Sequence, residues 1–322
     1  MDKILVTGGS GFIGTNLINR LVNNYSVFNL DKHTPANTKL ISHWKEIDIL
    51  DYINLEKEII NFDPDYIIHL AAVTDLNGRN NEYYNANVEG TENIIKICGK
   101  LKKLKKVIFT SSMYVCKPGY IPKTYNDYKP HTLYGESKVK GELLVKNITN
   151  PVLKWVIIRP TSIWGPWFGI PYIDFFNIVY QGKYFDFGRT CSKTYGYVEN
   201  IVFQIEKILI SDNANFKTLY LGDNPPIQIS QWANEISQEF RKRKIKKIPF
   251  LVIKTASILG DMLSKLSIRF PISSFRLSNM TTNNILPLDE IYEIANDLPV
   301  TRSEGTRQTI DWLISHKGYS RK

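Results

Sequence analysis

A glycine-rich stretch lies close to the start of the chain, Val6-Thr7-Gly8-Gly9-Ser10-Gly11-Phe12-Ile13-Gly14. An apolar run precedes it, and apolar residues at helical spacing follow it at Leu17, Ile18, Leu21 and Val22. This order predicts a strand, a tight turn and the first turn of a helix. Glycines at positions 8, 11 and 14 let the backbone approach a pyrophosphate, which the free N–H groups of a helix start attract. The stretch therefore favours a nucleotide-binding turn, although its spacing is GxxGxxG and not GxGxxG.

Composition is typical of a globular protein, with 43% hydrophobic and 22% charged residues among 322. The three cysteines, Cys98, Cys116 and Cys191, have no disulfide-framework or zinc-ligand spacing, so we expect no metal site and a reducing, cytoplasmic location. The first residues lack the pattern of a signal peptide.

The net charge is +10, and much of the excess lies in two runs, Lys100 to Lys106 and Arg241 to Lys247. Such runs attract acidic partners such as a phosphate-bearing substrate, nucleic acid or an anionic membrane. Neither run is interleaved with aromatic residues, so we favour solvated loops or helix ends and expect no nucleic-acid partner.

An apolar stretch from Pro249 to Leu266 contains Lys254, Asp261 and Lys265. A transmembrane helix is longer and nearly free of charge. A core or pocket helix is the favoured interpretation, contact with a membrane surface is the alternative, and no stable membrane insertion is expected.

A second apolar run, residues 25–31, ends at Asp31, about 20 residues beyond the glycine-rich turn. A carboxylate there accepts hydrogen bonds from the adenosine ribose 2′-OH and repels a 2′-phosphate. The sequence therefore predicts NAD as the cofactor in preference to NADP, with Lys32 leaving some tolerance for NADP.

Strand and helix patterns alternate over residues 1–165, which predicts a Rossmann-type, doubly wound parallel sheet that binds NAD. His69 lies on an otherwise apolar strand and is interpreted as a hydrogen-bonded core residue. Residues 166–322 are expected to form mainly a smaller α/β substrate-binding domain, with segments near 190–210 returning to the first domain. Helices are expected around residues 173–180, 199–210, 229–240 and 249–266.

Three polar residues carry the predicted chemistry. Tyr134 and Lys138 are four residues apart on an expected helix and so share one face, and Ser112 ends a strand. A tyrosine hydroxyl has a reference pKa of ~10, and a neighbouring ammonium group favours the phenolate. Tyr134 could then take a proton from a substrate hydroxyl while a hydride leaves the same carbon for the nicotinamide, and Ser112 could hold the substrate oxygen.

Together these motifs resemble an extended short-chain dehydrogenase/reductase of the NAD-dependent epimerase/dehydratase family. The matching elements, over about residues 1–200, are Thr7–Gly14, Asp31, Asp48-Ile49, His69-Leu70-Ala71-Ala72, Asn87-Val88, Thr110-Ser111-Ser112, Tyr134-Gly135-Glu136-Ser137-Lys138, Arg159–Pro166 and Tyr197-Val198-Glu199-Asn200.

The resemblance implies further roles. Asp48 and Ile49 would lie against the adenine, and Lys138 would hydrogen-bond the nicotinamide ribose. The full set of expected cofactor contacts is Gly8, Gly11, Phe12, Ile13, Gly14, Asp31, Asp48, Ile49, Leu70, Ala71, Ala72, Asn87, Ser111, Tyr134, Lys138 and Thr161. The expected substrate contacts are Thr74, Ser112, Tyr134, Ser162 and Lys193.

Relatives of this kind commonly act on nucleotide-diphosphate sugars, and a net charge of +10 suits such a dianion. Lys193 stands where the family often has a diphosphate-binding arginine, which puts the usual bidentate contact in doubt. Sugar dehydratases have an Asp-Glu pair where this chain has Met113 and Tyr114, so dehydration is set aside. The segment Val73–Arg79 is shorter than in common galactose epimerases, which indicates a differently shaped pocket.

Three functions remain open. The first is an NAD-dependent epimerase of a nucleotide-diphosphate sugar with a transient keto intermediate and Tyr134 as acid/base. The second is a net dehydrogenase or 4-keto-reductase of a nucleotide sugar or a hydroxysteroid-like substrate, and the third is a non-catalytic NAD-binding regulator. The resemblance also implies a homodimer formed through the helices at about 83–98 and 134–147.

Overall fold

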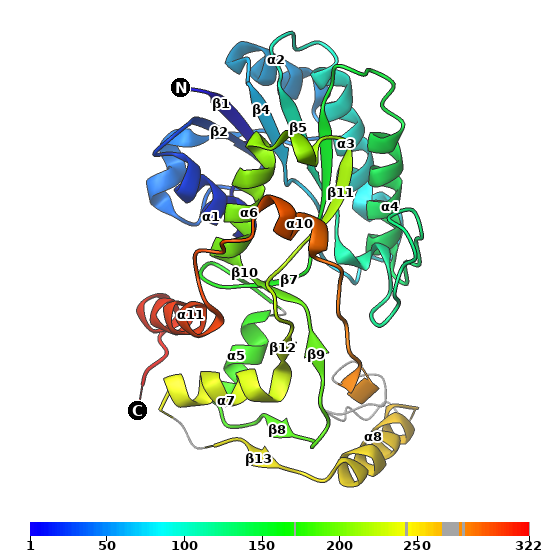
Figure 1. Cartoon of the computed structure of the whole chain (residues 1–322), viewed down its shortest axis with the longest axis vertical. Coiled ribbons are helices and arrows are strands. Elements are labelled where there is room, and N and C mark those ends of the chain that lie inside the picture. Colours follow the sequence, from blue (N-terminus) through cyan, green and yellow to red (C-terminus); the bar gives the residue numbers. More distant parts are fainter. Residues whose placement is uncertain (171, 242–243, 266–276, 279–280, 322) are drawn as a thin grey trace. The chain divides into compact units, whose positions relative to one another are not determined.

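The computed structural model describes residues 1–170, 172–241, 244–265, 277–278 and 281–321 (Figure 1). The chain divides into two units. The first comprises Met1–Ile163, Gly196–Gly222 and Pro287–Pro299, and the second comprises Trp164–Tyr195, Asp223–Leu286 and Val300–Lys322. Sequence analysis had no signal for the return of residues 287–299 to the first unit. Residues 171, 242–243 and 266, which fall in segments interpreted above, lie outside the described residues.

A seven-stranded sheet forms the centre of the first unit, in the order β11-β6-β5-β4-β1-β2-β3. Every pairing is parallel, which confirms the predicted doubly wound α/β fold. The order reverses between β1 and β4, the place where such sheets open a crevice for a ligand. The strands are β1 (Lys3–Thr7), β2 (Ser26–Asp31), β3 (Trp44–Glu46), β4 (Tyr66–His69), β5 (Lys106–Thr110), β6 (Trp155–Pro160) and β11 (Lys217–Leu221).

Helices cover the sheet in two groups: α1 contacts α6, while α3 contacts both α2 and α4. The central strands bury apolar side chains on both faces, which explains why they read as continuous apolar runs. Leu5, Ile67 and Val107 belong to one buried cluster with residues of α2, α3 and α4. The helices are α1 (Phe12–Leu21), α2 (Tyr52–Phe62), α3 (Asn85–Cys98), α4 (Leu133–Lys146), α6 (Val198–Ile210) and α10 (Asp289–Ile294), with short 3-10 turns at Thr38–His43, Glu82–Tyr84, Met113–Val115 and Asp212–Ala214.

The glycine-rich turn joins β1 to α1 through very close backbone contacts. Gly8 has a φ of 72°, and a Cβ atom there would lie 2.5 Å from the Ala71 backbone nitrogen. A Cβ on Gly14 would lie 2.5 Å from the Gly9 Cα atom. Only glycine therefore lets the first turn of α1 lie against the end of β1 and the segment after β4.

The second unit is built around Trp232 of α7. Its ring centroid lies 4.8 Å from that of Trp164 and 5.1 Å from that of Phe175, and its indole Nε1 donates to the Thr306 hydroxyl at 3.1 Å. The expected helices around 173–180, 229–240 and 249–266 are present in this unit, the last as a helix described from Phe250 to Lys265, and the one around 199–210 is present in the first. The elements are α5 (Tyr172–Tyr180), β8 (Phe185–Asp186), β9 (Ser192–Lys193), β12 (Ile227–Gln228), α7 (Ile229–Glu239), β13 (Lys246–Lys247), α8 (Phe250–Lys265) and α11 (Arg302–Lys317), and the chain passes between the units through β7 (Ser162–Trp164) and β10 (Tyr195–Tyr197).

Within the part of the chain that the structure describes, none of the helices combines the length and the apolar character needed to cross a membrane.

Replacing Gly8 with alanine tests the close approach of the turn to β4. Both Gly8 and Gly182 have positive φ, so Gly8→Ala and Gly182→Ala share a backbone strain of about 1–2 kcal/mol. Only Gly8 also faces backbone atoms, whereas nothing lies within 4 Å of a Cβ on Gly182. We expect Gly8→Ala to lower the free energy of unfolding by clearly more than Gly182→Ala in urea denaturation. Equal losses would contradict the close contact.

Candidate active site

Several of the predicted site residues lie where the strands of the parallel sheet end. The glycine-rich turn follows β1, Asp31 ends β2, Leu70–Ala72 follow β4, and Ser111-Ser112 follow β5. Carboxyl ends of parallel strands meet at one edge of a sheet, so these segments line one edge of the first unit.

Tyr134 and Lys138 reach this edge from α4. The Thr132 hydroxyl accepts a hydrogen bond from the Gly135 N–H at 3.1 Å and caps the helix start. A Cβ on Gly135 would clash with the carbonyl oxygen of Tyr114. Glycine at this position therefore allows the first turn of α4 to lie against the 3-10 turn that begins after Ser112.

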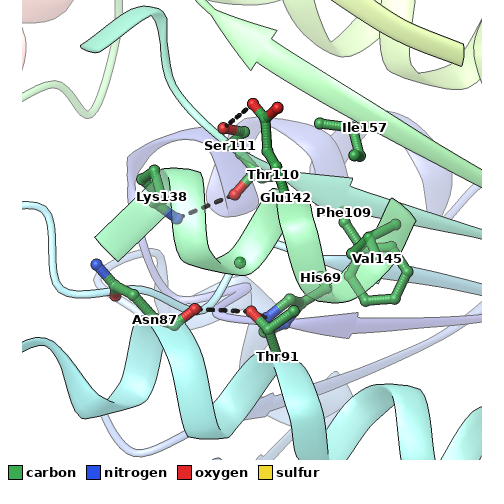
Figure 2. Close-up of a pocket in the computed structure, with 11 residues that line it drawn as sticks. His69, Asn87, Thr91, Phe109, Thr110, Ser111, Lys138, Glu142, Val145 and Ile157 are labelled. Atoms are coloured by element: carbon green, nitrogen blue, oxygen red, sulfur yellow. Dashed lines mark hydrogen bonds between the residues drawn. The ribbon is translucent and has the colours of Figure 1, made fainter. Parts of the chain in front are cut away.

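Lys138 is buried next to Tyr134, with its ammonium nitrogen 6.0 Å from the centroid of the tyrosine ring. The same ammonium group donates to the Thr110 carbonyl oxygen at 3.0 Å (Figure 2). Burial lowers the pKa of Lys138 to about 8. The rings of Tyr84 and Tyr114 flank Tyr134, with centroids at 6.1 and 6.3 Å. Tyr134 and Lys138 thus lie on one face of α4, as their spacing predicted, and both side chains are buried.

Glu142 lies one helical turn beyond Lys138 and is buried in the cavity drawn in Figure 2. It accepts a hydrogen bond from the Ser111 hydroxyl at 2.6 Å. The Arg159 guanidinium donates to both of its oxygens, each at 2.7 Å, and Tyr128 donates to Oε2 at 2.8 Å. Burial opposes ionisation of Glu142, but Arg159 and Ser111 outweigh it and hold the pKa of this carboxyl below its ordinary value. A bidentate ion pair therefore ties α4 to β6 and to the end of β5.

Sequence analysis missed this ion pair. In the sequence, Arg159 is recognised only as part of the family motif Arg159–Pro166, and Glu142 belongs to none of the motifs. The available signal was the spacing, because Glu142 follows Lys138 by four residues and so lies on the same face of α4.

His69 has the predicted role of a core residue. It is buried, with Nδ1 2.7 Å from the Thr7 hydroxyl and Nε2 3.3 Å from the Thr91 hydroxyl. Burial, together with the nearby Lys138 charge, lowers the pKa of His69 to about 3. The imidazole is therefore neutral at physiological pH.

Asp31 is placed against the glycine-rich turn. Its carboxylate accepts hydrogen bonds from the backbone N–H groups of Ser10 at 3.0 Å and His33 at 2.9 Å. Asn29, also on β2, accepts from the Gly9 N–H at 2.9 Å. The end of β2 thus fixes the turn and holds a carboxylate where an adenosine ribose would lie.

The remaining expected cofactor contacts have varied surroundings. Asp48 is exposed, and Ile49 is buried against Gly90. Both polar atoms of the Asn87 amide bond within the protein: Oδ1 accepts from the Val73 N–H, and Nδ2 donates to the Val73 carbonyl and the Ser137 hydroxyl. The Ser111 hydroxyl likewise donates to Glu142, and its backbone N–H donates to the Ile158 carbonyl oxygen at 2.7 Å. The roles of these residues stay predictions.

The expected substrate contacts do not all belong to one unit. Ser112 is buried at the start of the turn after β5, where its hydroxyl accepts from the Tyr114 N–H at 3.2 Å. Thr74 is exposed and Ser162 is half-buried, both in the first unit. Lys193 belongs to β9 of the second unit, and burial lowers its pKa.

Comparison with known proteins identifies the family. The model of the NAD dependent epimerase/dehydratase family matches residues 4–175, more than half of the chain. The chain belongs to this family. It is therefore an NAD-dependent enzyme of the extended short-chain dehydrogenase/reductase type.

Several known proteins match nearly the whole chain, among them one curated relative and two solved structures. The chain is 27% identical to an N-acetyl-alpha-D-glucosaminyl-diphospho-ditrans,octacis-undecaprenol 4-epimerase of Escherichia coli O157:H7, with 98% of this chain and 96% of that protein covered. Among solved structures, a UDP-glucose 4-epimerase of Thermotoga maritima is 20% identical, with a TM-score of 0.75 and 97% and 99% coverage. A UDP-N-acetylglucosamine 4-epimerase of Methanobrevibacter ruminantium M1 is 22% identical, with a TM-score of 0.74 and 98% coverage of both chains. The two structures share the fold of this chain.

The first unit fits the NAD that the family uses. The glycine-rich turn leaves no room for side chains at Gly8 or Gly14, which keeps the backbone open to a pyrophosphate. Asp31 would offer a carboxylate to the adenosine ribose, as the sequence predicts. The buried Thr161 hydroxyl at the end of β6 has no hydrogen-bond partner among the described residues, as expected of a group that a cofactor satisfies.

Replacing Asp31 with asparagine tests the preference for NAD. Asparagine keeps an acceptor for the Ser10 N–H but removes the charge that favours ribose hydroxyls over a phosphate. We expect NAD to bind about ten- to a hundredfold more weakly and NADP to bind relatively better, as measured by calorimetric titration. The exposed Glu46→Gln is the matched control. Unchanged affinities for both nucleotides in Asp31→Asn would contradict the assignment.

Breaking the buried ion pair on one side should destabilise the first unit. Arg159→Met removes the bidentate partner of the buried Glu142 charge and leaves only Lys146, whose ammonium nitrogen lies 3.5 Å from Oε2, as a cation beside it. We therefore expect a loss of about 3 kcal/mol in the free energy of unfolding. The double variant Glu142→Gln/Arg159→Met should recover part of this loss, as measured by urea denaturation.

The pH dependence of the free energy of unfolding provides a second test of the Glu142–Arg159 ion pair. Because the pKa of Glu142 is depressed in the folded state, its contribution is complete above its unfolded pKa and is lost as pH falls. Wild-type stability should therefore fall more steeply in acid than that of Glu142→Gln. Parallel pH profiles would contradict the assignment.

Proposed function

We propose that the protein is an NAD-dependent 4-epimerase that acts on a sugar carried on a diphosphate. The observation that carries this proposal is the buried Tyr134–Lys138 pair on α4, a helix that contacts the 3-10 turn beginning after Ser112. It lies at the edge of the sheet where we propose that NAD binds. Three of the proteins that match nearly the whole chain lend support, since they are named as 4-epimerases.

In the proposed reaction, Tyr134 takes the proton of the sugar 4-hydroxyl and later returns one to the 4-oxygen. Ser112 donates a hydrogen bond to that oxygen and steadies it as it becomes a ketone. Lys138 places a positive charge next to the phenolic ring and favours its ionised form. Bound NAD supplies the group that accepts the C4 hydrogen as hydride and returns it. Inversion then requires the 4-keto sugar to present its other face.

A nucleotide-diphosphate sugar is the first substrate candidate, and the net charge of +10 suits a diphosphate. Thr74, Ser162 and Lys193 are proposed as its contacts. The Escherichia coli relative is named for a sugar diphosphate joined to undecaprenol, so a polyprenyl diphosphate is the alternative carrier to test. We also propose a cytoplasmic homodimer formed through α3 and α4, which sedimentation velocity would test.

Replacing Tyr134 with phenylalanine tests the proposed acid/base. We expect about a 10²–10⁴-fold lower rate of 4-epimerisation, with NAD binding and thermal stability retained. The assay follows UDP-N-acetylglucosamine, UDP-glucose and N-acetylglucosaminyl-diphospho-undecaprenol by NMR. Tyr319→Phe, which removes a hydroxyl in the second unit, is the matched control.

Two further readouts separate the alternatives. An epimerase that returns the same hydride incorporates no solvent deuterium at C4 and retains its nucleotide, which denaturation of the purified protein should release as NAD. Net production of NADH would favour a dehydrogenase, and equal rates in Tyr134→Phe and the wild type would refute the role of Tyr134.

A further inference from the structure

Helix α8 of the second unit presents apolar side chains to solvent. Four large apolar residues are strongly exposed, namely Leu251 (71%), Val252 (55%), Ile258 (45%) and Leu259 (57%). They recur at helical spacing, with Leu251 seven and eight residues before the pair at 258–259, and so form one stripe. Ile253 and Ser257 are buried on the opposite face. The apolar stripe of α8 thus faces solvent, whereas an ordinary surface helix buries its apolar stripe against the core.

Basic residues surround this stripe in the sequence. Residues 241–261 contain seven, Arg241, Lys242, Arg243, Lys244, Lys246, Lys247 and Lys254, and one acidic residue, Asp261. Lys246 and Lys247 form the short strand β13, which pairs with β8 and ends just before α8. Lys254 is exposed on α8 itself, and the Arg189 guanidinium lies 4.3 Å from the ring centroid of Phe250 at the helix start.

These lysines differ from those of the first basic run. In that run Lys100, Lys103 and Lys105 form ion pairs with acidic residues of the first unit, and Lys106 donates to two buried carbonyl oxygens. Among the described residues, Lys246, Lys247 and Lys254 take part in none of the ion pairs. The positive charges of these three lysines are therefore available to interact with a partner outside the second unit.

We propose that the exposed face of α8 docks on the surface of an anionic lipid bilayer. An apolar stripe flanked by lysines is the pattern of a helix that lies in the plane of a membrane interface, with its side chains among the acyl chains and its cations at the headgroups. At 16 residues, α8 is about 24 Å long and too short to span a hydrocarbon core of about 30 Å. A second copy of the chain fits this face less well, because it would bring two clusters of like charge together.

Docking of this kind has a consequence for the substrate, which rests on the proposed function. A sugar diphosphate on a polyprenyl carrier stays at the membrane, so an enzyme held at the interface meets it by diffusion in two dimensions. The docking itself does not depend on which sugar reacts.

The experiment is flotation of the full chain with unilamellar vesicles of phosphatidylcholine alone, or of phosphatidylcholine and phosphatidylglycerol at about three to one. We expect the anionic vesicles to bind at least about tenfold more protein, less so in high salt. Leu251→Gln/Leu259→Gln should lower partitioning about tenfold or more. Ile53→Gln/Val152→Gln is the matched control, because these side chains are 77% and 78% exposed in the first unit.

A charge variant completes the test. Lys246→Gln/Lys247→Gln should reduce the preference for anionic vesicles, whereas Lys39→Gln/Lys57→Gln should leave it unchanged. Failure of the wild type to float, or equal flotation of the α8 variant, would overturn the proposal. The proposal would also be overturned if the wild type formed an oligomer in sedimentation velocity, the α8 variant did not, and neither protein floated with vesicles. Flotation needs no turnover, so it can fail or succeed independently of the epimerase assay.

Discussion

The carboxylate of Glu142 is the point on which the geometry of the first unit depends. Two nitrogens of Arg159, the Ser111 hydroxyl and the Tyr128 hydroxyl all donate to it. A charge taken out of water is costly unless it is paired and hydrogen-bonded, and this one is both. The ion pair therefore fixes α4 relative to the ends of β5 and β6, and with α4 it fixes Tyr134 and Lys138.

The same helix places Lys138 in surroundings that change its pKa. Its ammonium group is buried and held by the Thr110 carbonyl, and burial lowers its pKa towards physiological values. The charge on Glu142, one turn further along, acts in the opposite direction and favours the protonated lysine. One face of α4 thus carries Tyr134 and Lys138 near its start and Glu142, which binds Arg159, one turn later.

The two basic runs are similar in sequence but have different surroundings in the structure. In the first run, Lys100, Lys103 and Lys105 form ion pairs within their own unit, so these three lysines add little net charge to the surface. The second adjoins an exposed apolar stripe on α8. The two runs have a similar composition, and what separates them is whether the fold places carboxylates nearby.

The sequence by itself determined the sheet and the nucleotide-binding turn. Their signals are local: glycines where a side chain would clash, apolar runs of strand length, and Tyr134 and Lys138 one helical turn apart. The core role of His69 was also predictable from its apolar neighbours, since a buried imidazole needs only nearby hydroxyls.

Only the tertiary structure decided which distant groups meet. Glu142 and Arg159 are 17 positions apart, and no periodicity connects them. The return of residues 287–299 to the first unit and the outward direction of the α8 stripe were equally hidden, because an apolar helix has the same sequence pattern whether it faces a core or solvent. Local spacing fixes the face of a helix on which a side chain lies, but long-range packing fixes what that face meets.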